Sequence, residues 1–239
     1  MTLLALSHVS KSYGALKVTD DISLSVSEGE VLGILGPNGA GKTTLFNLIA
    51  GEAACDQGQV FWQGRDITRL RPHQRCRAGI GRAYQVPQPF GNLSVFENLV
   101  TAACFGGGQA ERSAWETAGR VLAQTGLQRH ANRPAAGLTL LDRKRLELAR
   151  ALATRPRLLL LDEIAGGLTE PEAVELVGEL QRIKGEGVTM VWIEHVVHAL
   201  LSIADRLLVL NFGQKLAEGA PQAVMSDPAV RRVYIGMEA

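Results

Sequence analysis

A glycine-rich segment between an apolar strand and a helix is the feature that most constrains this chain. Residues 36–43 read GPNGAGKT, which fits the pattern G-x-x-x-x-G-K-[ST]. The apolar stretch 30–35 (EVLGIL) precedes this loop, and a helical pattern begins near Gly41. Backbone N–H groups of such a loop turn inward around phosphate oxygens, and the helix N-terminus adds a favourable dipole. The alternative, a glycine turn with a chance lysine, does not account for the strand and helix on either side.

The loop therefore predicts binding of a nucleoside triphosphate together with Mg²⁺. Lys42 is expected to neutralise the β- and γ-phosphates, and the Thr43 hydroxyl is expected to hold the metal ion. The predicted nucleotide-binding residues are Gly36, Pro37, Asn38, Gly39, Ala40, Gly41, Lys42, Thr43 and Thr44.

Two carboxylates follow a second apolar strand. Residues 158–161 are four leucines, which is typical of a strand covered on both faces in a parallel sheet. Carboxylates at the C-terminal end of such a strand face the same edge as the phosphate loop. We expect Asp162 to bind Mg²⁺ and Glu163 to polarise an attacking water. Taken alone, the pair would also suit the N-cap of the next helix.

Strand and helix patterns alternate over much of the chain. Residues 3–10 and 22–26 alternate apolar and polar side chains, as half-buried strands do. Residues 188–193 and 206–210 predict buried strands, and 172–184 predict a helix. Strands that alternate with helices indicate an α/β fold with crossover helices around a parallel sheet.

The middle of the chain has a different pattern. Residues 87–154 show mainly helical periodicity, with a break at the three glycines 106–108 and no convincing strand. We expect them to form a helical subdomain inserted into an α/β core of residues 1–86 and 155–239. The whole chain, 1–239, would then be a single domain.

Composition excludes several classes of protein. Hydrophobic residues make up 46% of the 239, so the chain is globular and not disordered. The 25 basic and 24 acidic side chains nearly cancel, which argues against nucleic-acid binding through bulk charge. Cys55, Cys76 and Cys104 lack C-x-x-C spacing, which fits a reducing cytosol without disulfides or a zinc site. We expect no signal peptide and no membrane-spanning segment.

With these motifs and five further positions, the sequence resembles the ATP-binding subunits of ABC transporters over nearly its whole length. Tyr13 matches the aromatic residue that stacks on adenine, and His195 matches the histidine that contacts the γ-phosphate. Gln85 matches the glutamine that senses Mg²⁺ and water and links to the membrane partner. Gly167 and Leu168 fall in the loop that crosses to the second ATPase subunit. Taken singly, Tyr13 could pack in a turn, His195 could cap a helix and Gln85 could lie on the surface. Their order and spacing together favour a nucleotide site.

The resemblance implies a P-loop NTPase core with a mainly parallel sheet, an N-terminal antiparallel β subdomain and the inserted helical subdomain. It also implies that the nucleotide is ATP, with catalysis by Glu163, His195 and Gln85, and Mg²⁺ binding by Thr43, Gln85 and Asp162. Within the family, the sequence is most similar to the ATPases of branched-chain amino acid importers. Three stretches carry this likeness: residues 138–163, residues 165–172 (AGGLTEPE) and VYIG at 233–236.

The family's signature segment, which caps the ATP held by the opposite subunit, is altered here. Leu138, Thr139, Leu140, Leu141 and Asp142 stand where the family has leucine, serine, two glycines and glutamine. The N–H donors survive if the φ angles of the two leucines stay negative. Three interpretations remain open: a modified clamp that works, which we favour; pairing with a different ATPase that carries an intact signature; or ATP binding without turnover.

The expected partners follow from the same resemblance. They are a second ATPase subunit, identical or different, integral membrane subunits and, indirectly, a solute-binding protein, with no nucleic acid. The expected location is the cytoplasmic face of the inner membrane, as a peripheral subunit that powers import. A soluble ABC ATPase acting on nucleic acid or ribosomes is one alternative, and a regulatory subunit that does not hydrolyse ATP is another.

Overall fold

The computed structural model describes residues 1–235, with the backbone alone for Tyr234 and Ile235. The chain divides into two compact units, residues 1–72 with 189–239 and residues 73–188. Gly236, the last residue of the VYIG stretch, lies outside the described residues.

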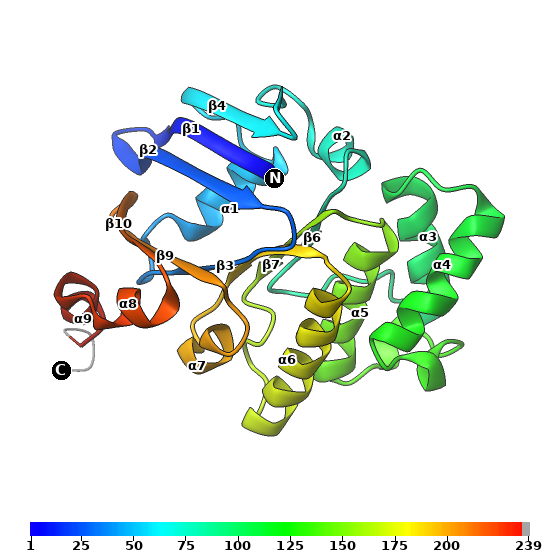
Figure 1. Cartoon of the computed structure of the whole chain (residues 1–239). Helices are drawn as coiled ribbons and strands as arrows, with labels where there is room; N and C mark the ends of the chain where they lie inside the picture. The colour runs from blue at the N-terminus through cyan, green and yellow to red at the C-terminus, as the bar shows by residue number, and fades with distance from the viewer. Residues whose placement is uncertain (236–239) are drawn as a thin grey trace. The chain divides into compact units, whose positions relative to one another are not determined.

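The first unit holds an antiparallel sheet with strand order β2-β1-β4-β5 (Figure 1). The strands are β1 (Thr2–Tyr13), β2 (Leu16–Ser27), β4 (Gln57–Trp62) and β5 (Arg65–Asp66). Strand β1 pairs with β2 on one side and with β4 on the other, where Leu4 faces Trp62. Apolar residues of β1 such as Leu4 and Val9 are fully buried, as the alternating pattern predicts.

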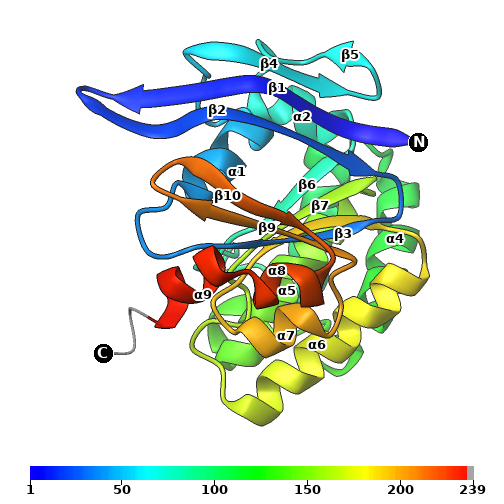
Figure 2. The same ribbon diagram turned by 60° about the vertical axis from the view of Figure 1, so that its left-hand side comes forward.

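The first unit also holds four strands in the order β10-β9-β3-β8, of which β10 and β9 lie side by side in Figure 2. Strand β3 (Val31–Leu35) is parallel to β8 (Thr189–Ile193) and to β9 (Arg206–Asn211), and β10 (Gln214–Gly219) returns antiparallel to β9. Every residue of β3 and β8 is buried, which explains their unbroken apolar sequences. The helices of this unit are α1 (Lys42–Ala50), α7 (Val197–Leu201), α8 (Pro221–Ser226) and α9 (Pro228–Ile235).

The second unit combines two parallel strands with helices. Strand β6 (Ile80–Ala83) pairs with β7 (Leu158–Asp162), so that Ala83 lies opposite Leu161. Helices α3, α4 and α5 pack against one another, as Figure 1 shows in green. The helical elements are α2 (Pro72–Arg77), α3 (Val95–Thr101), the π-helix η1 (Ala102–Gly106), α4 (Glu111–Gln124), η2 (Gln128–His130), η3 (Ala135–Gly137), α5 (Leu140–Ala153) and α6 (Glu170–Gly185).

Local sequence explains where several helices begin and end. Ser94 and Glu97 form a reciprocal capping box at the start of α3, and Thr169 with Glu172 does the same for α6. The glycines 106–108 end η1 and separate it from α4, as the sequence predicts. Within residues 1–235, no helix is long and apolar enough to cross a bilayer.

The α/β fold with an antiparallel N-terminal sheet is confirmed, and so are the predicted strands of the two sheets. Four strands were missed: β4, β5, β6 and β10. They are short or carry glycine and charged residues, as in β6 (IGRA) and β10 (QKLAEG), so their apolar periodicity is weak. Main-chain pairing with neighbouring strands stabilises them instead.

Replacing Gly58 by alanine should destabilise the protein. Gly58 lies in β4 with φ +83°, and an added Cβ would lie 2.3 Å from the His8 carbonyl oxygen. The left-handed conformation alone costs about 1–2 kcal/mol for a residue with a Cβ. We expect urea unfolding to show a loss of more than about 2 kcal/mol.

Gly178→Ala is the matched control, because Gly178 lies inside α6 and an added Cβ there meets no heavy atom within 4 Å. We expect this variant to gain about 0.4–1 kcal/mol. Equal stability of the two variants would contradict the strained geometry at Gly58.

Candidate functional site

The phosphate loop connects β3 to α1 in the first unit. Gly41 caps α1 with φ +97°, and an added Cβ would lie 2.3 Å from the Val18 carbonyl oxygen, so the position requires glycine. The Lys42 ammonium is buried inside the loop and donates to the carbonyl oxygens of Gly36 (2.7 Å) and Pro37 (3.0 Å). Thr43 is exposed in the first turn of the helix. The loop therefore presents a cation and a helix N-terminus in one place, which suits phosphate groups.

The turn between β9 and β10 supports this loop, and sequence reasoning missed it. The N–H of Gly213 donates to the carbonyl oxygen of Ala40 (3.1 Å), and the N–H of Asp20 donates to the carbonyl oxygen of Gly213 (2.8 Å). The β9–β10 turn thus bonds to the phosphate loop on one side and to β2 on the other. The local sequence signal is Gly213 itself, since glycine marks turns, and it does not indicate which segment the turn contacts.

Two further candidates lie in the first unit. Tyr13 ends β1, is half exposed at 51%, and has the Lys11 ammonium 5.4 Å from its ring centre. His195 follows β8 and is exposed, and its main-chain N–H donates to the carboxylate of the buried Glu194 (3.0 Å). Both rings are therefore accessible to a ligand.

In the second unit, the parallel strands β6 and β7 bring two predicted residues together. Gln85 follows the end of β6 and Glu163 follows the end of β7, so both lie at the same edge. The Gln85 side-chain amide donates to the Glu163 carboxylate at 2.5 Å. Glu163 has φ +46°, a left-handed conformation that costs roughly 1–2 kcal/mol for a residue with a side chain. Such strain is typical of functional positions.

Asp162, the last residue of β7, is buried and has a cationic partner. The Arg82 guanidinium donates to the Asp162 carboxylate at 2.7 Å, and both side chains are 8% exposed. The same guanidinium lies 4.7 Å from the ring centre of Tyr84. Arg82 is a site residue that the sequence did not reveal, because arginine in a four-residue strand carries no motif.

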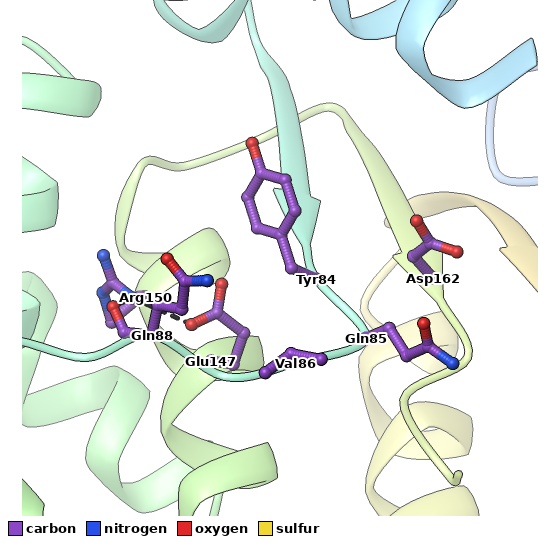
Figure 3. A pocket seen from close by; sticks show the side chains of 7 residues that line it. All are labelled: Tyr84, Gln85, Val86, Gln88, Glu147, Arg150 and Asp162. Atoms are coloured by element: carbon purple, nitrogen blue, oxygen red, sulfur yellow. Dashed lines mark hydrogen bonds and ion pairs between the residues drawn. The ribbon is translucent and has the colours of Figure 1, made fainter. Parts of the chain in front are cut away.

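A cavity of about 560 Å³ opens beside these residues (Figure 3). Gln85 and Asp162 lie on one side of it, and Arg150 with its ion-pair partner Glu147 lies on the other. The residues that line it are Tyr84, Gln85, Val86, Gln88, Glu147, Arg150 and Asp162. The lining mixes polar, charged and apolar side chains.

The signature segment, residues 138–142, forms the start of α5. Thr139 is the N-cap, and its hydroxyl accepts from the Asp142 N–H (3.2 Å) and donates to the Asp142 carboxylate (3.0 Å). Leu140 and Leu141 are helical residues with negative φ, so their N–H groups remain at the helix N-terminus. Leu141 is buried, whereas Leu140 is 46% exposed and lies beside Gly167, 3.6 Å from where a Cβ on that glycine would be.

Asp142 does not add an exposed negative charge, because its side chain is buried. Beyond the Thr139 hydroxyl, its carboxylate lies 3.4 Å from the His130 ring and 3.6 Å from the Arg145 guanidinium. Arg145 also pairs with Glu175 and Glu179 of α6. Burial raises the pKa of Glu179, and hydrogen bonding and the charge of Arg145 partly offset this.

Comparisons with known proteins identify the family. A model of the ABC transporter family matches residues 19–166, more than half of the chain. The chain belongs to the ATP-binding subunits of ABC transporters. A second model, branched-chain amino acid ATP-binding cassette transporter, matches residues 214–236, and the last of these is not described by the structure.

Relatives of this ABC ATPase extend over nearly its whole length. The lipopolysaccharide export system ATP-binding protein LptB of Acidithiobacillus ferridurans is 38% identical over 95% of this chain and 93% of its own. The high-affinity branched-chain amino acid transport ATP-binding protein BraF of Pseudomonas aeruginosa is 34% identical over 98% of both chains. The crystal structure of a nucleotide-free ATP-binding cassette from an ABC transporter has a TM-score of 0.89 and 32% identity, covering 99% of this chain and 100% of its own.

The chain is therefore an ATP-hydrolysing subunit of an ABC transporter, as the resemblance in its sequence indicated. ATPases of this family work in pairs, together with membrane subunits. Transporter relatives of this kind favour transport over the alternative of an ATPase acting on nucleic acid or ribosomes.

Substitution of Thr139 tests the N-cap of the signature helix. Thr139→Val removes the hydroxyl that bonds to Asp142 and keeps the side-chain volume, and we expect it to lower stability by about 1 kcal/mol in urea unfolding. Thr139→Ser keeps the hydroxyl and should stay within about 0.5 kcal/mol of the parent. Equal losses in both variants would show that the hydroxyl does not cap α5.

Proposed function

We propose that this ATPase powers the import of a small polar solute, a branched-chain amino acid or a related molecule, through separate membrane subunits. The observation that carries the choice of substrate is the match of residues 214–236 to the branched-chain amino acid model. The relative BraF supports it, and the membrane subunits and a solute-binding protein would supply specificity. In such an assembly the chain is a peripheral subunit at the cytoplasmic face of the inner membrane.

Lipopolysaccharide export is the second candidate, because LptB relatives are as similar over the same length. The ATPase chain alone does not touch the transported molecule in either case. The difference between the two candidates therefore lies in the membrane subunits that dock to it. The cavity beside Gln85 and Arg150 is our candidate for that docking surface.

The proposed chemistry assigns each site residue a role. Tyr13 stacks on the base, which is worth roughly 1–3 kcal/mol, and residues 36–44 bind the phosphates. Glu163 and His195 orient the water that attacks the γ-phosphate. Residues 138–142 of one subunit contact the ATP of the second, through the Thr139 hydroxyl and the N–H groups at the start of α5.

The oxygen donors Thr43, Gln85 and Asp162 are of the type that Mg²⁺ takes, and Asp162 would have to share its carboxylate with the Arg82 guanidinium. No cluster of three or more His, Cys, Asp or Glu side chains able to hold a metal is present among residues 1–235. Mg²⁺ prefers one or two protein oxygens together with substrate phosphates, so Thr43, Gln85 and Asp162 are the proposed ligands. When bound, the ion would neutralise charge on the phosphate oxygens.

Glu163→Gln should bind ATP with nearly normal affinity and hydrolyse it at least about 100-fold more slowly, since the general base is lost. Binding would be measured with a fluorescent ATP analogue and turnover by phosphate release. The control is Glu116→Gln, an exposed glutamate of α4, which should hydrolyse ATP normally. Near-normal turnover in the Glu163 variant would remove Glu163 from its proposed role.

The same variant tests the altered signature by light scattering. With ATP and Mg²⁺ we expect a shift from monomer to dimer, because the N–H donors and the Thr139 hydroxyl are retained. ATP binding without dimerisation would instead favour a different ATPase as the partner. A parent protein that binds ATP but shows no turnover, even with its membrane subunits, would favour the regulatory alternative.

Uptake measurements test the substrate. In cells whose own copy carries Lys42→Ala, uptake of radiolabelled leucine, isoleucine and valine should fall and be restored by the unaltered chain, but not by Glu163→Gln. Uptake of an unrelated sugar is the control. Unchanged amino acid uptake together with impaired lipopolysaccharide export would support the second candidate.

A further inference from the structure

Lys144 connects two parts of the site that work on different nucleotides in the proposed dimer. It lies in α5, five residues after the N-cap Thr139, and is only 3% exposed. Its ammonium donates to the carbonyl oxygen of Gln85 at 2.5 Å and approaches that of Glu163 at 3.4 Å. Lys144 therefore contacts the main chain of Gln85 and of Glu163, and the side chains of these two residues bond to each other.

The geometry at Glu163 explains why such a tether matters. Glu163 has φ +46°, a conformation that persists only when its surroundings hold it in place. The Gln85 amide holds its side chain, whereas the N–H of Gly166 (3.1 Å) and the Lys144 ammonium approach its carbonyl oxygen. Displacement of the carboxylate by about 1 Å would be enough to slow catalysis strongly.

We propose that Lys144 is a positioning residue that links the signature segment to Gln85 and Glu163 of the same subunit. This inference rests on the proposed function, in which residues 138–142 contact the partner's ATP while Glu163 acts on its own. Thr139 and Lys144 lie about 7.5 Å apart along one rigid helix, so a shift at the first moves the second. Engagement of one nucleotide thereby adjusts the base that hydrolyses the other.

The neighbours of Lys144 fix the helix that carries this link. Asp142 holds the Thr139 hydroxyl, and Arg145 ties α5 to Glu175 and Glu179 of α6. A buried ammonium with carbonyl acceptors is stable only while those acceptors stay in reach. Gln85 and Glu163 therefore cannot shift far without disturbing α5.

Lys144→Met tests the link, because it keeps the length of the side chain and removes its donors. We expect kcat for ATP to fall about 100-fold, with KM and the affinity for a fluorescent ATP analogue within about threefold of the parent. Lys144→Arg retains a charged donor and should recover at least about a third of the parent kcat. The control is Arg143→Met, an exposed neighbour that bonds to the Ala136 carbonyl oxygen and should leave kcat unchanged.

A double-mutant cycle measures the coupling itself and also serves if Lys144→Met does not fold. Thr139→Ala and Lys144→Gln would be combined, and kcat measured for the parent, both single variants and the double variant. If the helix transmits the signal, the loss caused by Thr139→Ala should be at least about threefold smaller in the Lys144→Gln protein. Multiplicative losses, or a normal kcat in Lys144→Met, would overturn the inference.

The two proposals fail in different ways. Suppose that the parent chain and Arg143→Met hydrolyse ATP and dimerise, and that Lys144→Met is unaffected. That result would leave the proposed function intact and remove only the role of Lys144. A parent chain that neither dimerises nor hydrolyses ATP, even with its membrane subunits, would remove the proposed function first.

Discussion

Main-chain pairing of β6 with β7 is the constraint on which the second unit's site depends. The two strands are parallel and in a register that places Ala83 opposite Leu161, so their C-terminal ends are level. Gln85 and Glu163 are 78 residues apart in the sequence and meet at this edge. Shifting the register by one residue would separate the largely buried Asp162 carboxylate from the Arg82 guanidinium, which it contacts at 2.7 Å. Pairing of β6 with β7 thus sets the position of the Glu163 carboxylate, the catalytic base in our proposal.

The altered signature shows how a helix N-terminus is kept without glycine. Thr139 supplies the cap, and both leucines take right-handed helical angles in which N–H groups remain available. The two leucine side chains have different surroundings: Leu141 is buried, and Leu140 lies against Gly167. The Asp142 carboxylate is buried beside the side chains of Thr139, His130 and Arg145. The unusual residues therefore retain the donors of the segment and leave one apolar side chain exposed at its start.

Helix α5 contacts several parts of the candidate site in the second unit, as the proposed positioning role of Lys144 requires. Its polar side chains reach the carbonyl oxygens of Gln85 and Gln88 through Lys144 and Arg150, and reach α6 through Arg145. These contacts join the signature segment, Gln85 with Glu163, and the wall of the proposed docking cavity within one unit. The contacts of Lys144 and Arg150 have main-chain acceptors, so they depend on backbone position, whereas Arg145 contacts the side-chain carboxylate of Glu179.

The sequence by itself determined the phosphate loop, the acidic end of β7, the α/β fold and the family, because each rests on local patterns of glycine, charge and apolar periodicity. Only the tertiary structure decided that Gln85 contacts Glu163, that Arg82 pairs with Asp162 and that Asp142 is buried. It also placed the turn at Gly213 beneath the loop and Lys144 at two carbonyl groups. All of these contacts join residues that are distant in sequence, so local patterns could not reveal them. The contacts of Gly213 and Lys144 also use main-chain atoms, which every residue possesses.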